Sequence, residues 1–177
     1  MRIVRIVTVV CAMIALFAPA VSAQPPSAKP GPELQRLKKL VGTWDATVKT
    51  AQGESKGTMV YKMDMGGLWL VSNFKADFGG QPFQGKGIDG YDPLKKKYVS
   101  VWVDSMSPTL LLFEGTFDKS GKVFTQLGEG PGMDGKMTKF KSVSEMKDPD
   151  TMVFTMSSPD QNGKDQTMLT ITYKRKQ

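Results

Sequence analysis

Residues 58–65 have the sequence TMVYKMDM, in which Met or Tyr occupies every second position. Successive side chains of a β-strand point to opposite faces, so this pattern predicts a strand with one continuous apolar face. Further short runs rich in β-branched and aromatic residues follow, separated at intervals of roughly ten residues by Gly, Pro, Asp and Asn. This spacing predicts an all-β, antiparallel, up-and-down fold.

We expect ten strands, at residues 43–51, 56–65, 68–77, 83–91, 97–104, 109–117, 122–129, 137–147, 151–158 and 166–175. An open sheet of this size would leave two unpaired edges, whereas closure into a barrel removes both. The one predicted helix is short and amphipathic, spanning Glu33 to Val41, with Leu34, Leu37, Leu40 and Val41 on one face. Pro32 favours its start and Gly42 its end. We therefore predict a barrel of about ten strands with a short N-terminal helix.

The N-terminus has the pattern of a signal peptide. Arg2 and Arg5 precede an apolar stretch, and Val21-Ser22-Ala23 forms a small-residue cleavage site. We expect residues 1–23 to be a signal peptide, residues 24–32 a flexible linker rich in Pro, Ser and Ala, and residues 33–177 a single barrel domain. The processed protein would be secreted or periplasmic, without a transmembrane span.

Composition excludes much familiar chemistry. The chain has no histidine, and its only cysteine, Cys11, lies in the predicted leader. The processed domain therefore lacks the residues of Ser-His-Asp and Cys-His nucleophiles, ordinary zinc sites and His- or Cys-ligated haem, and we predict no metal and no cofactor. Without Arg2 and Arg5, 22 basic residues face 17 acidic ones, and the lysines are scattered among the acids. This distribution argues against binding to nucleic acid.

Two resemblances to known families accompany this pattern. A short helix followed by Gly42-Thr43-Trp44 at the first strand resembles the Gly-x-Trp opening of lipocalins and other calycins. In that superfamily the tryptophan plugs one end of the barrel, and a basic residue of the last strand often packs over it. The resemblance implies structural roles at the barrel end for Trp44 and for Arg175, which occupies the matching position.

A closer resemblance covers nearly all of the predicted domain. The succession Leu40–Trp44, Gly66–Leu70, Gln81–Phe83 with Gly90–Asp92, Lys95–Tyr98 and Trp102–Met106 is similar to a bacterial domain family of unknown function with a calycin-like fold. This resemblance implies a lipocalin-like barrel and brings no activity. Nitrobindin-type haem barrels have a similar strand count, but they use an axial histidine that this chain lacks.

The alternation along the strands selects side chains for the interior. The clearest faces are those of the second, fifth and ninth predicted strands, whereas both faces of the third are apolar. As candidate ligand-binding residues of the interior we select Tyr61, Met63, Met65, Trp69, Phe74, Tyr98, Trp102, Asp104, Met152, Phe154 and Met156.

Several functions fit these residues. An aromatic and methionine-lined interior suits a small apolar or amphipathic ligand, because flexible thioethers adapt to varied shapes. The alternative is a barrel filled by its own side chains that acts through protein-protein interaction in the cell envelope. A minor alternative is Cu(I) binding by the thioethers of Met59, Met63 and Met65.

Catalysis is disfavoured. Asp104 is the best candidate for a catalytic acid, but the sequence places no second carboxylate near it, as two-carboxylate hydrolysis would need. We expect Asp104 instead to accept hydrogen bonds from the backbone where its strand ends. Residues 85–90, GKGIDG, match G-x-G-x-x-G, but no helix follows to bind a pyrophosphate. We expect these glycines to mark a bend of the barrel.

Overall fold

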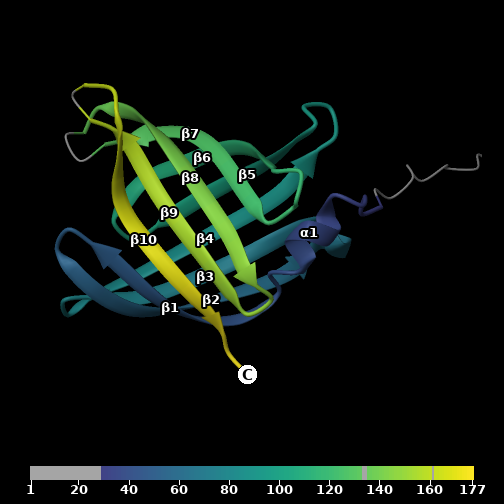
Figure 1. Ribbon diagram of the computed structural model, residues 1–177, viewed down its shortest axis with the longest axis horizontal. Helices are drawn as coiled ribbons and strands as arrows, with labels where there is room; N and C mark the ends of the chain where they lie inside the picture. Colours follow the sequence, from purple (N-terminus) through teal and green to yellow (C-terminus); the bar gives the residue numbers. More distant parts are fainter. Residues whose placement is uncertain (1–28, 133–134, 161) are drawn as a thin grey trace, which may run out of the picture.

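The computed structural model, which describes residues 29–132, 135–160 and 162–177, is a closed barrel of ten antiparallel strands (Figure 1). Each strand pairs with its neighbours in the chain, and β10 returns to pair with β1. The predicted fold is therefore confirmed. The predicted signal peptide, and the linker up to residue 28, lie outside the described residues. Within the described part of the chain, no helix has the length and apolar character needed to span a membrane.

All ten strands lie where the alternation predicts them. Most ends agree within two residues, and β2 begins three residues earlier than expected because the β1–β2 pairing continues to Gly53. The strands are β1 Gly42–Thr50, β2 Gly53–Asp64, β3 Trp69–Phe78, β4 Gln81–Asp92, β5 Lys97–Asp104, β6 Ser107–Phe117, β7 Val123–Pro131, β8 Met137–Asp148, β9 Thr151–Pro159 and β10 Asp165–Arg175.

The helix α1, Leu34–Lys38, covers one end of the barrel, which we call the closed end (Figure 1). Leu34 and Leu37 pack against Leu70, Tyr98 and Phe124 beneath them. The Tyr98 hydroxyl donates a hydrogen bond of 2.9 Å to the carbonyl oxygen of Glu33. Burial of these apolar side chains, rather than the propensity of a five-residue helix, holds α1 in place.

The helix is shorter than the predicted segment from Glu33 to Val41. The chain turns after Lys38, and Val41 is 38% exposed, so it does not belong to the buried face. Gly42 has a φ of 135°, a conformation that favours glycine, and it starts β1 directly after this turn. The carbonyl groups left free at the helix end accept hydrogen bonds from two side chains of the barrel, Trp44 and Arg175.

Arg175 ties the last strand to the start of the barrel. Its guanidinium lies 4.0 Å from the centre of the Trp44 ring, with which it shares a cross-strand pair. It donates hydrogen bonds to the carbonyl oxygens of Val41 at 2.7 Å and Lys39 at 2.8 Å, and it pairs with Asp150 at 3.1 Å. Arg175 therefore links β10, β1, the helix end and the β8–β9 turn at one point.

Replacement of Arg175 by alanine should lower the free energy of unfolding by about 2–3 kcal/mol, because charge-assisted hydrogen bonds and the contact with the indole are lost together. Urea unfolding followed by tryptophan fluorescence measures the change. The matched control is Lys176→Ala, which removes an exposed cation 4.0 Å from Asp45 and should change stability by less than about 0.5 kcal/mol. Equal effects of the two substitutions would contradict this role of Arg175.

Candidate ligand site in the barrel interior

The interior of the barrel contains space that water can reach. Asp89 on β4 and Tyr61 on β2 share their faces with the buried residues Leu70 and Ser72, so both point inward. The barrel wall encloses both side chains, yet part of each remains accessible to water. A side chain that is enclosed and still accessible borders a hollow. The interior is therefore not completely filled by its own side chains.

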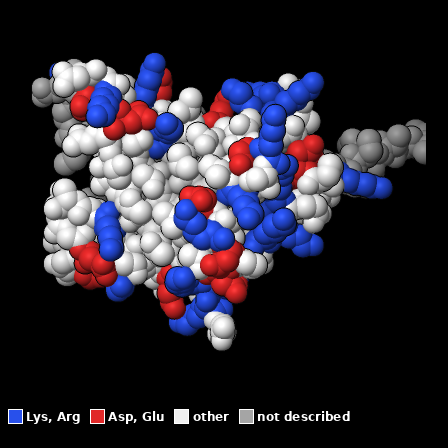
Figure 2. Space-filling view, in the orientation of Figure 1, with Lys and Arg blue, Asp and Glu red and all other residues white. Residues whose placement is uncertain are grey.

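The hollow opens away from α1. We call the end opposite the helix the open end; it carries the β1–β2, β3–β4 and β9–β10 connections. Figure 2 shows the surface indented at this left-hand end, between the β1–β2 hairpin below and the tips of β9 and β10 above. Trp102, Phe154 and Met156 lie on inward-facing positions and are only half-buried. These side chains line the accessible space.

A short hydrogen-bond network lies on the interior wall. The side-chain amide of Gln126 donates to the Ser100 hydroxyl at 2.5 Å, and this hydroxyl in turn donates to Oδ1 of Asp89. Ser100 and Gln126 are both buried. We call these three residues the Asp89 network. It connects β7, β5 and β4, and it ends in a carboxylate.

Burial has the largest influence on the pKa of Asp89, the acid at the end of this network. It raises the pKa of Asp89 to about 6, because the low-dielectric surroundings disfavour the charged form, while the hydrogen bond from Ser100 lowers the pKa. Burial also raises the pKa of Tyr61, and the nearby Tyr173 and Asp89 raise it further. Tyr173 has its pKa raised by burial as well. At neutral pH the interior thus holds neutral phenols beside a largely ionised carboxylate.

Two glycines of β4 make room for an indole ring on the interior wall. A Cβ atom at Gly85 would collide with the ring of Trp102, and one at Gly87 would collide with the hydroxyl of Ser72. On the outer face, Gly90 leaves space in the same way for the ring of Trp69. The glycines expected to mark a bend thus allow tryptophans to lie flat against the strand. The indole nitrogen of Trp102 donates to Asp104 at 2.9 Å, which fixes the ring.

Most of the predicted interior residues point inward. Phe74 and Met152 are buried in a core cluster centred on Trp44, and Tyr61, Trp102 and Phe154 pack against that cluster from the interior. Asp104 lies near the open end, where it accepts hydrogen bonds from Trp102 and from the backbone nitrogen of Met106. The second contact is of the kind expected for this acid at its strand end.

Two predicted residues lie elsewhere. Met65 is not in a strand but in a short 3₁₀ turn, η1 Met65–Gly67, and its side chain is 59% exposed. Trp69 precedes the fully buried Leu70 and therefore faces outward, over Gly90. The placements of Met65 and Trp69 in the interior were therefore wrong. Strand β2 ends at Asp64, one residue before Met65. In β3 the alternating positions that face inward are those of Leu70, Ser72 and Phe74, so Trp69 lies on the outer face.

Two other predicted residues belong to the closed end. Tyr98 and Met63 pack in the cluster beneath α1, away from the accessible space. Met59 lies in the separate cluster around Trp44, so the methionines of β2 do not form one continuous row. Among the described residues, no group of three or more His, Cys, Asp or Glu side chains could hold a metal ion.

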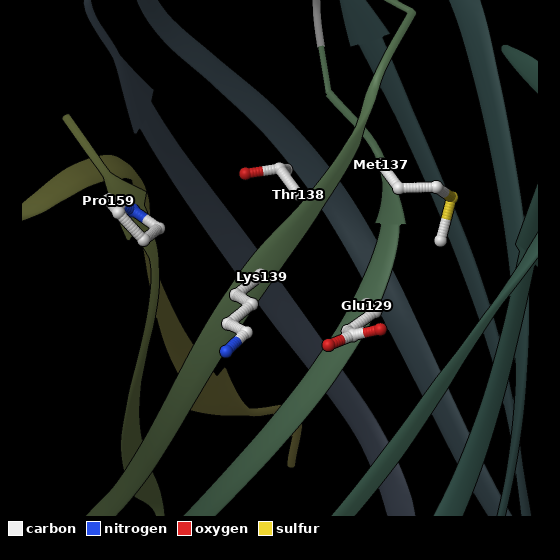
Figure 3. Close-up of a pocket in the computed structure, with 5 residues that line it drawn as sticks. All are labelled: Glu129, Met137, Thr138, Lys139 and Pro159. Atoms are coloured by element: carbon white, nitrogen blue, oxygen red, sulfur yellow. The ribbon is translucent and has the colours of Figure 1, made fainter. Parts of the chain in front are cut away.

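Two surface depressions lie outside the interior. The larger, of about 300 Å³, is at the open end beside β7, β8 and the end of β9, where Glu129, Met137, Thr138, Lys139 and Pro159 line it. Figure 3 shows these side chains spread around the depression rather than converging on one point. The smaller, of about 220 Å³, lies between α1 and η1. Neither brings together the polar groups that would orient a ligand.

The outer wall carries an exposed apolar patch, which we call the outer patch. It runs across β4, β5, β6 and β7, where Ile88, Val101 and Leu112 are neighbours in register. Its exposed members, between 39% and 64% accessible, are Ile88, Val103, Leu110, Leu112 and Leu127. Such a patch is typical of a surface that contacts another protein.

The Asp89 network is not predicted from the sequence. Ser100 shares the inward face of β5 with Tyr98 and Trp102, but none of the three network residues is among the selected candidates. The signal was present in β4: Lys86 is a charged strand residue that favours solvent, and Asp89, three positions later, must face the opposite side. The sequence instead assigns the glycine-rich motif around Asp89 to a bend of the barrel, and this assignment gives Asp89 no role.

Comparison with known proteins supports the fold and leaves the function open. Residues 29–175 match a family described as "Protein of unknown function (DUF1579)". No curated protein matches the chain significantly. The crystal structure of Rv2717c from M. tuberculosis superposes with a TM-score of 0.61 at 17% identity, covering 83% of this chain and 99% of that one. A designed fluorescence-activating β-barrel gives a TM-score of 0.45 at 16% identity, covering 78% and 95%.

Asp89→Asn should stabilise the protein at about pH 7.5 by about 1–3 kcal/mol. The folded pKa of about 6 lies above the ordinary value of 3.8, so the wild-type protein loses stability as the pH rises between these values. Asparagine removes that loss, and its advantage should shrink as the pH falls towards 4. Urea unfolding across this pH range measures the effect.

The control is Asp45→Asn, which removes the same charge from the exposed side of β1 and should leave stability nearly unchanged. A destabilised Asp89→Asn protein at neutral pH would show that the carboxylate is held by favourable contacts instead.

Proposed function

The chain belongs to the DUF1579 family of unknown function, and we propose that it binds a small apolar or amphipathic molecule inside the barrel. The observation that carries this proposal is the Asp89 network in a hollow otherwise lined by aromatic and thioether side chains. Ligand sites commonly combine a mostly apolar concave wall with a few polar groups that orient the ligand. The interior has both components.

The cost of the buried acid supports the same proposal. Asp89 is ionised at neutral pH only against the effect of burial, so it destabilises the folded chain. Residues that reduce stability are concentrated at functional sites, where the same property serves binding or catalysis. An acid required only for folding would instead be paired with a cation or held by several donors.

We also propose that the protein acts outside the cytoplasm, as a secreted or periplasmic carrier or sensor. The pattern of residues 1–23 supports export, since a positive segment, an apolar stretch and a small-residue cleavage site follow in order. The processed domain has no cysteine, so its stability in an oxidising compartment depends on packing and hydrogen bonds alone. N-terminal sequencing of protein from the exported fraction should begin at Gln24.

A second candidate function is protein binding through the outer patch. Several apolar side chains there are about half exposed and lie on four adjacent strands. Single apolar residues scattered over a surface need no explanation, whereas a contiguous group of them indicates an interaction site. On this hypothesis the interior is only a core, and the partner is another protein of the cell envelope. The two functions depend on opposite faces of the same strands.

One matched pair of substitutions separates the two candidates. Phe154→Glu adds a charge to the interior wall, whereas Leu112→Glu adds the same charge to the outer patch. Native mass spectrometry of wild-type protein from its exported fraction should show a stoichiometric small-molecule adduct. Leu112→Glu should keep this adduct and Phe154→Glu should lose it, because the substitution replaces the apolar contact of the Phe154 ring with a hydrated carboxylate in the space of the ligand's apolar body.

Circular dichroism confirms that each variant is folded, and Met156→Glu replaces Phe154→Glu if the latter unfolds. A wild-type mass without adduct, unchanged after exposure to mixed lipids, would contradict the interior site and favour the outer patch. Retention of the adduct by a folded interior variant would contradict it as well.

A further inference from the structure

The interior of the barrel is acidic, whereas the outside is basic. The strand lysines, such as Lys75 and Lys86, occupy outward positions and are exposed, and Figure 2 shows Lys and Arg gathered towards the end that carries α1. Asp89 and Asp104 occupy inward positions. Among the described strand residues, the only inward cation is Arg175, which is engaged at the closed end by Asp150 and backbone carbonyls.

The Asp89 network leaves one carboxylate oxygen without a protein donor. Ser100 has a single hydroxyl proton, which it donates to Oδ1 of Asp89, and it accepts from Gln126 in return. No described residue donates to Oδ2. Oδ2 is also accessible to water. Every side-chain nitrogen or oxygen atom of the described residues that is buried from water has a hydrogen-bond partner, and Oδ2 has none. Oδ2 therefore presents a negatively charged acceptor to the hollow.

The surroundings of this acceptor suit a positive charge. Tyr61 lies near both Asp89 and Tyr173, and burial keeps the two phenols neutral at physiological pH. Aromatic rings of Tyr61, Trp102 and Phe154 border the accessible space. The faces of such rings attract cations, most strongly where water is excluded. A bound ammonium group would also supply the donor that Asp89 lacks.

Building on the proposed interior site, we propose that its ligand is an organic cation: a protonated primary or secondary amine on an apolar body. The ammonium group donates to Oδ2 of Asp89, and the apolar body extends towards the open end between Trp102 and Phe154. A carboxylate ligand would be repelled by Asp89 and Asp104. A neutral alcohol would satisfy the acceptor but would leave the charge of the interior uncompensated.

Three probes with one apolar body test the proposal. They are 2-(2-naphthyl)ethylamine, 2-(2-naphthyl)ethanol and 2-naphthylacetate, which differ in the charge of the polar group. Isothermal titration at about pH 7.5 should show the amine binding about tenfold or more tightly than the alcohol, as expected for a hydrogen bond between charged groups. The carboxylate should bind most weakly.

Asp89→Asn should reduce the affinity for the amine to about that for the alcohol, because the variant offers the ammonium group no charged partner while the apolar contacts remain. The matched control Asp45→Asn changes net charge equally on the outer face and should alter neither affinity. For wild-type protein, the preference for the amine should fall as the pH is lowered to about 5, where Asp89 takes up a proton.

The outcomes separate this inference from the proposed function. Equal binding of all three probes, or an amine preference that survives Asp89→Asn, would overturn the organic-cation assignment while supporting an interior site. Binding of none of the probes would overturn both. Loss of every probe from Asp89→Asn in a folded protein would also overturn the assignment, because it would show a general change of the cavity rather than loss of one charge pair.

Discussion

Pairing between β1 and β10 is the constraint on which the rest of the structure depends. Those two strands come from opposite ends of the domain, and their seven-residue register turns a ten-stranded sheet into a barrel. Closure satisfies the backbone groups of both edges and gives the sheet an inside. Arg175 strengthens this seam at the closed end, where it joins both strands to the segment that follows α1. The helix α1 covers one end of the barrel, and no described helix covers the other.

Closure also sorts the charges of the chain. With a period of two, a strand whose core residues face the interior presents its lysines to solvent, and this leaves a basic exterior. Asp89 is on the same inward face as Gly85, Gly87 and Tyr91, and so is carried into the hollow. The resulting electrostatic difference between the two faces is a property of the closed sheet rather than of any single strand. On our proposal, this difference gives the interior its preference among ligands.

The sequence predicted the fold well because the fold depends on alternation, turns and length, which are local. It predicted the inward residues of β2, β5 and β9 for the same reason. It failed at Met65 and Trp69, since the exact end of β2 and the parity of β3 depend on tertiary contacts around Leu70. The Asp89 network could not be assembled from sequence, because Gln126 and Ser100 meet only through the register of β5, β6 and β7.

The interior contains features that reduce stability and that the proposed binding function would explain. Glycines at 85 and 87 weaken a strand, yet they let the Trp102 ring lie against the wall and leave room in front of it. The burial of Asp89 costs free energy, and among the described residues neither a cation of the wall nor a second donor offsets this cost. A barrel selected for stability alone would fill that space with larger side chains and replace the acid. Both features concern the same volume, and on our proposal the specificity of the protein lies at Asp89 rather than at the rim.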